Sequence, residues 1–180
     1  MPRCTSREEG KWRIRDEVIR KPVPIPYDIT QNPLNTNEWS FPLMECIHIA
    51  MFAMSIGTIA VVDFRLLGLL FKERTPAELL KATGIWTLIG LTCVLSTGMI
   101  IFTTDPLSYY YNYSFRYKLI ALLVAIIFNY TIHRKVAMSN SSGGVSVMTG
   151  AVSLLLWTSV VFAGIFYAFT EELHYVGGPN

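Results

Sequence analysis

The chain has 180 residues, of which 52% are hydrophobic and only 16% are charged, and its mean hydropathy is +0.39. This composition is too apolar for an ordinary soluble domain, and the length is too short for a many-helix transporter, so we expect one small membrane domain. A formal net charge of +2 gives no indication of nucleic-acid binding. Three scattered cysteines form no CxxC pair, which removes support for a zinc site or for covalent c-type haem attachment.

Residues 1–40 form a polar tail with seven basic and six acidic residues and without the pattern of a signal peptide. Apolar and charged side chains over 6–20 fit a short amphipathic helix, and the composition fits a tail without regular structure equally well. Prolines at 22, 24 and 26 predict extended backbone there. We therefore expect a mostly extended tail followed by a membrane domain over 41–180.

Four apolar segments are long enough to cross a bilayer, near residues 41–63, 84–104, 116–137 and 146–170. Backbone groups in lipid must be hydrogen-bonded within their own segment, so each segment is predicted to be a helix. Short connections make sequential helices antiparallel. The predicted fold is an all-α, up-down four-helix transmembrane bundle, with both termini at one end, called side A, and the 63–83 and 134–146 loops at side B.

The segments between the spans carry signals of the membrane boundary. Pro76 after Thr75 has the pattern of a helix start within a charged connector. The 105–117 loop holds five tyrosines, a composition typical of the headgroup region. By the positive-inside rule the basic residues of side B favour a cytoplasmic side B and periplasmic termini, although counting the whole tail reverses that majority. These side B residues are Arg65, Lys72, Arg74, Lys81, Arg134 and Lys135.

Glu45 and His48 are ionisable residues inside the first apolar segment. Placing such a group in hydrocarbon costs at least ~2.5–3.5 kcal/mol on insertion scales, so it normally faces a partner helix, a cavity or a cofactor. Both residues share a helix face with Phe52 and Ser55. This pair is the predicted functional site, and the alternative is a pair that only hydrogen-bonds to a neighbouring helix.

Two glycines, Gly98 and Gly164, are expected on the second and fourth helices at about the depth of His48. They either allow close helix packing or leave room for a flat ligand such as haem or a quinone headgroup. We expect Glu45 and His48 to point into a cavity between these glycines. Lys118 or Arg116 would lie near enough to keep Glu45 ionised.

A second polar stripe lies on the third span. Its members recur at helical spacing and are Lys118, Leu122, Ala125, Asn129 and His133. Lys118 fits a side chain that extends to the headgroups of side A equally well. His133 lies near side B, where Asp63 and Arg65 are also expected to emerge. A histidine at that boundary beside Arg134 is expected to be solvated, which gives it little weight as a metal ligand.

Two histidines can hold a b-type haem only if both lie at about the same depth in the membrane. At ~1.5 Å per residue, His48 lies ~10 Å and His133 ~24 Å from side A, too far apart for one iron. His174 returns to side A but lies past the acidic end of the fourth span, so it could pair with His48 only if that last turn bends inward. Met99 on the second helix is closer in depth, so His48 with Met99 is the better axial pair.

Several stretches together resemble an uncharacterised family of small bacterial four-helix integral membrane proteins. The resemblance covers about residues 40–170 and rests on FPLMECIH at 41–48, VDFRLLG at 62–68, STG at 96–98, DP at 105–106 and FRYKL at 115–119, with Asn112, Asn129 and His133. The family has no established activity, and its shape is similar to that of four-helix b-type cytochromes and quinone-linked membrane anchors. Its motif residues map onto Glu45, His48, Asp63, Arg65, Arg116, Lys118, Asn129 and His133. The family usually has an Arg after the glycine of the fourth helix, where this chain has Ile165, so an anion or propionate partner there loses support.

Two function classes fit these observations. The first is a non-enzymatic membrane subunit of a larger redox or energy-converting complex in the bacterial inner membrane, with residues 1–40 and the 105–117 loop contacting other subunits. The second is an electron-transfer protein that holds haem b or a quinone near His48. No nucleophile elbow, phosphate loop or metal-ligand set points to a soluble enzyme.

Overall fold

The structure, a computed structural model, describes residues 32–139 and 143–176, with side chains described as far as Tyr167 in the last helix. Over these ranges every regular element is helical. Four helical segments are long and apolar enough to cross a membrane. They are Ser40–Leu66, Pro76–Phe102, Tyr113–Met138 and Gly144–Tyr167. The predicted four-helix transmembrane bundle is therefore confirmed. The possible amphipathic helix over 6–20 and the extended backbone predicted at the prolines 22, 24 and 26 lie outside the described residues.

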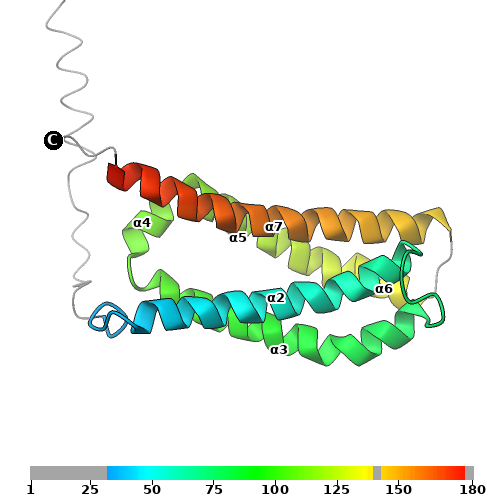
Figure 1. The fold of residues 1–180 in the computed structure, drawn as a ribbon. Helices are drawn as coiled ribbons and strands as arrows, with labels where there is room; N and C mark the ends of the chain where they lie inside the picture. The colour runs from blue at the N-terminus through cyan, green and yellow to red at the C-terminus, as the bar shows by residue number, and fades with distance from the viewer. Residues whose placement is uncertain (1–31, 140–142, 177–180) are drawn as a thin grey trace, which may run out of the picture.

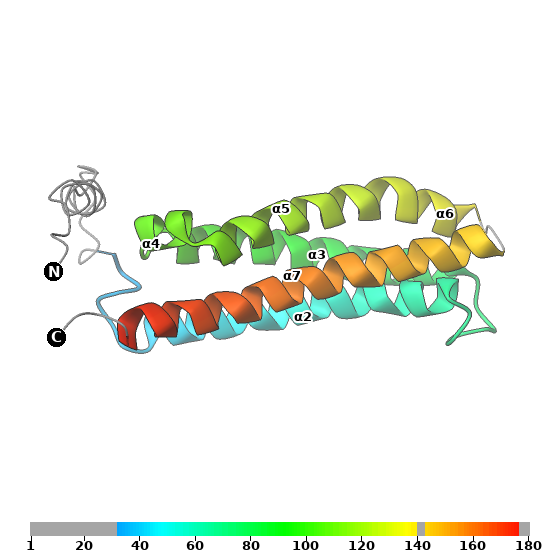
Figure 2. The same cartoon turned by 90° about the horizontal axis from the view of Figure 1, so that it is seen from above.

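The four spans run side by side, with the start of α2 and the end of α7 at side A (Figures 1 and 2). The elements are α2 (Ser40–Leu66), α3 (Pro76–Phe102), α4 (Pro106–Tyr111), α5 (Tyr113–Phe128), the π-helix η2 (Asn129–His133), α6 (Arg134–Met138) and α7 (Gly144–Val176). Helices α2 and α3 form one antiparallel hairpin, α5 and α7 form the other, and α2 packs along α7 to join them. Helix α3 touches the third span mainly at α6. The ring of helices is therefore loosest between α3 and the third span.

Helix α3 begins at Pro76, earlier than the apolar stretch from residue 84 indicated. The side chain of Thr75 accepts a hydrogen bond from the Glu78 N–H at 3.2 Å, and the Glu78 carboxylate accepts one from the Thr75 N–H at 3.2 Å. This capping box satisfies two backbone donors, and Pro76 at the first helical position needs none. The start signal at Pro76 is thus confirmed, while the expectation that residues 76–81 are part of a connector is wrong.

The predicted 105–117 loop contains a short helix, α4, which no sequence pattern indicated. Asp105 caps its start by accepting from the Ser108 N–H at 3.2 Å. Asn112 separates α4 from α5 and accepts from the N–H groups of Ser114 and Phe115. Polar caps at both positions let the chain reverse direction at the membrane boundary without leaving backbone donors unsatisfied.

Residues just before α2 are tied to the end of α3. The Asn32 side chain donates to the Thr103 carbonyl at 3.0 Å, and the Asn35 side chain donates to the Thr104 carbonyl at 3.1 Å. Carbonyls at a helix C-terminus have no partner within the helix, so these amides supply it. The chain therefore enters α2 from a position held against the neighbouring helix at side A.

The core lies around Trp157, with Ile59, Leu91, Leu122 and Val160 packed about it. Small residues bring helices close together, as is usual in membrane bundles. Most other large apolar side chains of the described spans are exposed on the outside of the bundle. An outer surface of this kind fits contact with a lipid bilayer, so the chain is an integral membrane protein by the length and composition of its helices.

Candidate functional site

The third span is interrupted by one π-helical turn, η2, which no sequence pattern indicated. A π turn is wider than an α turn and occurs frequently at functional sites. Asn129 at its start is 7% exposed and His133 at its end is 1% exposed. Four members of the stripe predicted on this span are buried, namely Leu122, Ala125, Asn129 and His133.

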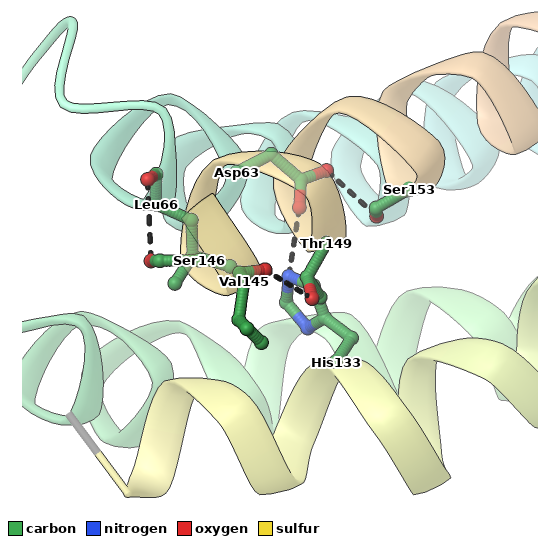
Figure 3. Close-up of polar contacts among 7 residues, drawn as sticks. All are labelled: Asp63, Leu66, His133, Val145, Ser146, Thr149 and Ser153. Carbon is green, nitrogen blue, oxygen red and sulfur yellow. Dashed lines mark hydrogen bonds and ion pairs between the residues drawn. The ribbon is translucent and has the colours of Figure 1, made fainter. Parts of the chain in front are cut away.

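Asp63, His133 and Ser153 form a buried polar cluster contributed by α2, η2 and α7 (Figure 3). Nε2 of His133 lies 2.7 Å from Oδ1 of Asp63, and the Ser153 hydroxyl donates to Oδ2 at 2.8 Å. The Asp63 side chain is fully buried, at 0% exposure. A carboxylate only accepts hydrogen bonds, so with Asp63 ionised the His133 proton sits on Nε2. Three spans are thereby connected through one carboxylate.

The close approach of α7 to α2 allows this cluster to form. A Cβ added to Gly150 would lie 3.0 Å from the backbone oxygen of Asp63, so a larger residue would push the two helix backbones apart by a few tenths of an ångström. The hydroxyl of Ser146 donates to the Leu66 carbonyl at 3.2 Å and holds the start of α7 against the end of α2 (Figure 3). Ser153, further along α7, then reaches Asp63.

The second ring nitrogen of His133, Nδ1, is buried and has no hydrogen-bond partner within the described part of the chain. Figure 3 shows this nitrogen turned away from Asp63. A buried polar atom without a partner is costly and uncommon in folded proteins. His133 also lines a pocket of about 380 Å³ between α2, α3 and the third span. An unused hydrogen-bonding group therefore lies in the residue that forms the wall of this pocket.

The pocket is apolar with a few polar groups on its wall and cations at its rim. Its lining includes Ile59 and Val62 from α2 and the amide side chain of Asn129. Ile85 and Leu88 of α3, both more than half exposed, also line it, so the pocket opens sideways on the outer apolar surface. Exposed Lys81 and Arg134 line it as well. The loose packing between α3 and the third span accounts for this opening.

The expectation that His133 is solvated beside Arg134 is wrong, because the imidazole is almost fully buried. Arg134 points outward, whereas the π turn directs the adjacent His133 into the bundle, where it is hydrogen-bonded to Asp63. Asp63 was likewise expected where the first helix leaves the hydrocarbon, and it is buried. The sequence did place both residues near side B, but nothing in it singled out Ser153.

His48 lies in a different setting near side A. Its Nδ1 is 2.8 Å from the Thr97 hydroxyl, and that hydroxyl donates to the Cys93 carbonyl at 2.7 Å. The His48 Nδ1 is therefore the donor, which leaves its Nε2 as an acceptor or ligand atom. A Cβ on Gly98 would lie 3.3 Å from Cε1 of the His48 ring, so the ring packs directly against this glycine. The partly buried imidazole is held between α2 and α3.

Of the other residues predicted for this site, Gly164 and Lys118 lie close together, whereas Glu45 and Met99 do not point into the bundle. A Cβ on Gly164 would lie 3.5 Å from Nζ of Lys118, and Lys118 interacts electrostatically with both Glu45 and His48. Glu45 is exposed instead of pointing into the bundle, since it lies one turn nearer the end of α2. Met99 is 68% exposed on the outer surface, because Gly98 occupies the face of α3 that meets His48. The binding roles of these residues stay predictions.

The two imidazoles belong to separate regions. His133 is bonded to Asp63, and at ~1.5 Å per residue Asp63 lies ~22 Å from His48 along α2. Among the side chains that the structure describes, those of residues 32–139 and 143–167, no group of three or more His, Cys, Asp or Glu is arranged to hold a metal ion. A second hollow, of about 520 Å³, lies between α5 and α7 and is lined mainly by exposed aromatic residues such as Tyr113 and Phe162.

Residues 41–170 match a protein family described as a family of unknown function (DUF6644). The match covers the four spans almost completely and leaves out residues 1–40, as the motif resemblance indicated. Comparison with curated proteins and with solved structures finds no match.

Proposed function

This chain belongs to the DUF6644 family of unknown function, and we propose from its own geometry that it is a non-catalytic membrane subunit that binds a quinone-type molecule beside His133 and supports electron transfer in a larger redox complex. The observation that carries the proposal is Nδ1 of His133, which is buried without a partner among the described residues, in a side chain that lines the pocket. A ligand oxygen at this position would satisfy the nitrogen.

A quinone is a flat ring with an oxygen at each of two opposite edges and an apolar tail. Neutral His133 accepts from a quinol hydroxyl at Nδ1, and protonated His133 donates to a quinone carbonyl from the same atom. Asp63 at Nε2 orients the ring and stabilises the protonated form, as carboxylates do beside catalytic histidines. The Asp63–His133 pair therefore suits both redox forms of such a ligand.

The shape and position of the pocket support the same ligand class. Its volume of about 380 Å³ lies within the usual range for small-molecule sites. The opening between Ile85 and Leu88 faces the outer apolar surface, which gives access to a molecule dissolved in the bilayer. The headgroup would lie against Asn129 and His133, and the apolar tail would leave through this opening into lipid.

The proposed protein partners bind at side A. Tyr110, Tyr111, Tyr113 and Tyr117 are exposed on the 105–117 segment, and aromatic side chains are enriched at protein interfaces. Residues 32–35 are fixed to the end of α3, so the preceding tail starts at the same surface. The basic residues of side B favour a cytoplasmic side B in a bacterial inner membrane, with the termini in the periplasm.

Filling the pocket tests the proposal without touching the Asp63–His133 pair. Gly84 lines the pocket, and a Cβ there meets nothing within 4 Å. Gly84→Leu should fold and should weaken binding of a short-tailed quinone analogue by on the order of 10-fold or more, because the side chain occupies the site. Binding is measured by titrating the purified protein in nanodiscs with decylubiquinone and a menaquinone analogue.

Gly57→Leu is the matched control, because Gly57 is exposed on α2, does not line the pocket and also has open space around its Cβ. It should leave binding unchanged. Equal affinities for the two variants, or no binding by the unaltered protein, would exclude a quinone at this pocket.

A haem-binding or quinone-binding role at His48 is the second candidate. The hydrogen bond from Nδ1 to Thr97 fixes the ring and leaves Nε2 free to ligate, which is how axial histidines are usually oriented. His48→Ala should then remove reduced-haem absorption bands, whereas His133→Ala should preserve them. Met99→Leu should have no effect, because Met99 faces outward. Absence of haem bands in the unaltered protein rules out haem binding at His48. If His48→Ala lowers the quinone affinity and Gly84→Leu does not, the quinone site lies at side A.

A further inference from the structure

The loop of residues 67–75, between α2 and α3, presents three consecutive apolar side chains to the outside of the bundle. Leu69, Leu70 and Phe71 are all about half exposed or more. They differ from the outward-facing side chains of the spans because they lie beyond the last turn of α2, among charged residues. Contiguous exposed apolar side chains in a connecting loop indicate a contact surface.

The loop has a defined backbone that fixes where these side chains lie. Gly68 adopts φ +73°, its N–H bonds to the Arg65 carbonyl at 3.0 Å, and the Leu69 N–H bonds to the Phe64 carbonyl at 3.0 Å. This arrangement is a Schellman cap, in which glycine takes the left-handed conformation and the following apolar residue is held in place. The direction of the chain after α2 is therefore set by hydrogen bonds.

The second half of the loop is held equally firmly. Phe71 adopts φ +56°, a region that bulky residues rarely enter. The Arg74 N–H bonds to the Phe71 carbonyl at 3.0 Å, and the Arg65 side chain donates to the Arg74 carbonyl. A left-handed bulky residue persists only where its surroundings hold it, and such residues are concentrated at functional positions.

The surface around this loop is basic. Lys72 and Arg74 are exposed within it, and exposed Lys81, Arg134 and Lys135 lie at the same end of the bundle. The exposed acidic residues at this end of the described chain are Glu73 and Glu78, and Glu78 is engaged in the cap of α3. Apolar side chains flanked by exposed lysine and arginine are complementary to an anionic membrane surface, with a hydrocarbon boundary below and phosphates above.

We propose that the 67–75 loop is an anchor for anionic phospholipid in the leaflet at side B. Leu69, Leu70 and Phe71 insert at the boundary of the hydrocarbon, while Lys72 and Arg74 contact lipid phosphates. The proposal is independent of any ligand in the pocket beside His133.

The full chain in nanodiscs of phosphatidylcholine, with or without about a third phosphatidylglycerol, tests the insertion. Leu70→Cys, in a background with Cys4, Cys46 and Cys93 replaced by serine, carries a bimane label. Quenching of bimane by a lipid with a shallow nitroxide should be stronger in the anionic discs, and quenching by aqueous iodide weaker. Equal quenching in both compositions, or full access to iodide in both, would overturn the proposal, and protection by a copurified protein in neutral discs would do the same.

Lipid retention supplies the second measurement. Native mass spectrometry should show preferential retention of phosphatidylglycerol, and Lys72→Gln with Arg74→Gln should lower that preference by on the order of 10-fold, because each basic residue near an anionic leaflet contributes roughly fivefold. Arg116→Gln is the control, since Arg116 is exposed at side A. An unchanged preference in the double variant, or an equal loss in the control, contradicts the assignment to this loop.

Discussion

His48 and His133 are both histidines within membrane spans, yet their surroundings differ in kind. His48 is partly exposed and donates to the neutral hydroxyl of Thr97, whereas His133 is 1% exposed and bonds to the carboxylate of Asp63. The sequence made His48 the more interesting residue, since it sits within the first apolar segment. The structure reverses the order of burial, because burial depends on the neighbouring helices and not on depth along one of them.

The difference predicts unequal sensitivity to mutation. Removing one member of a buried charged pair strongly destabilises the folded protein, because the remaining group keeps its desolvation cost without its partner. A partly exposed imidazole such as that of His48 regains hydrogen bonds from water or headgroups when its partner is lost. We therefore expect substitutions around His133 to cost more than the corresponding substitutions around His48.

The largest expected effect is that of Asp63→Ala. It leaves the His133 and Ser153 groups unsatisfied in the bundle and should lower the free energy of unfolding by about 2–4 kcal/mol. Thr97→Ala, the matched change for His48, should cost less than about 1 kcal/mol, in the range of membrane hydrogen bonds. Steric trapping in bicelles measures both values. Equal losses would show that the two regions do not differ energetically.

Two glycines sharpen the comparison at the level of packing. Gly150→Ala places a Cβ 3.0 Å from the backbone oxygen of Asp63, which cannot move without shifting α2, and should cost about 1–3 kcal/mol. Gly98→Ala meets only the His48 ring, at 3.3 Å, and the helix propensity of alanine offsets part of the strain, so a loss below about 1 kcal/mol is expected. Unfolding titrations in mild detergent compare the two. A greater loss for Gly98→Ala would place the tighter helix contact at side A.

A smaller effect is expected for Ser153→Ala, which removes one of the two hydrogen bonds to Asp63. The loss should be about 1 kcal/mol. Because Asp63 also holds His133, the ¹⁵N chemical shifts of the His133 imidazole should change, whereas those of His48 should not. Altered His48 shifts, or unaltered His133 shifts, would show that the carboxylate does not connect the three helices as described.

The smallest effect is predicted for Gly164→Ala. The new Cβ would lie 3.5 Å from Nζ of Lys118, an ordinary contact, so the free energy of unfolding should stay within about 0.5 kcal/mol of the original value. The same unfolding titration provides the measurement. A large loss would indicate that the region between Gly164 and Lys118 is packed more tightly than the region around Gly150.

The sequence by itself determined the number and type of the spans. Backbone groups in lipid must be satisfied within each segment, so four apolar stretches of sufficient length have to be helices. Local capping chemistry fixed the start of α3 at Pro76, since Thr75 and Glu78 are close in sequence. Helical periodicity also placed Ala125 and Asn129 on one face of the third span, and both are buried. Each of these features depends only on residues within a turn or within one span.

Tertiary structure alone decided which polar residues meet. Asp63, His133 and Ser153 come from three spans, and their contact depends on the offset between helices and on the close approach at Gly150. The exposure of Glu45 and the outward position of Met99 were settled in the same way. Periodicity places a residue on a face of its own helix, but the direction of that face is set by packing energies summed over all four helices. The π turn that brings His133 to Asp63 has no local sequence signature, so it too became visible only in the folded bundle.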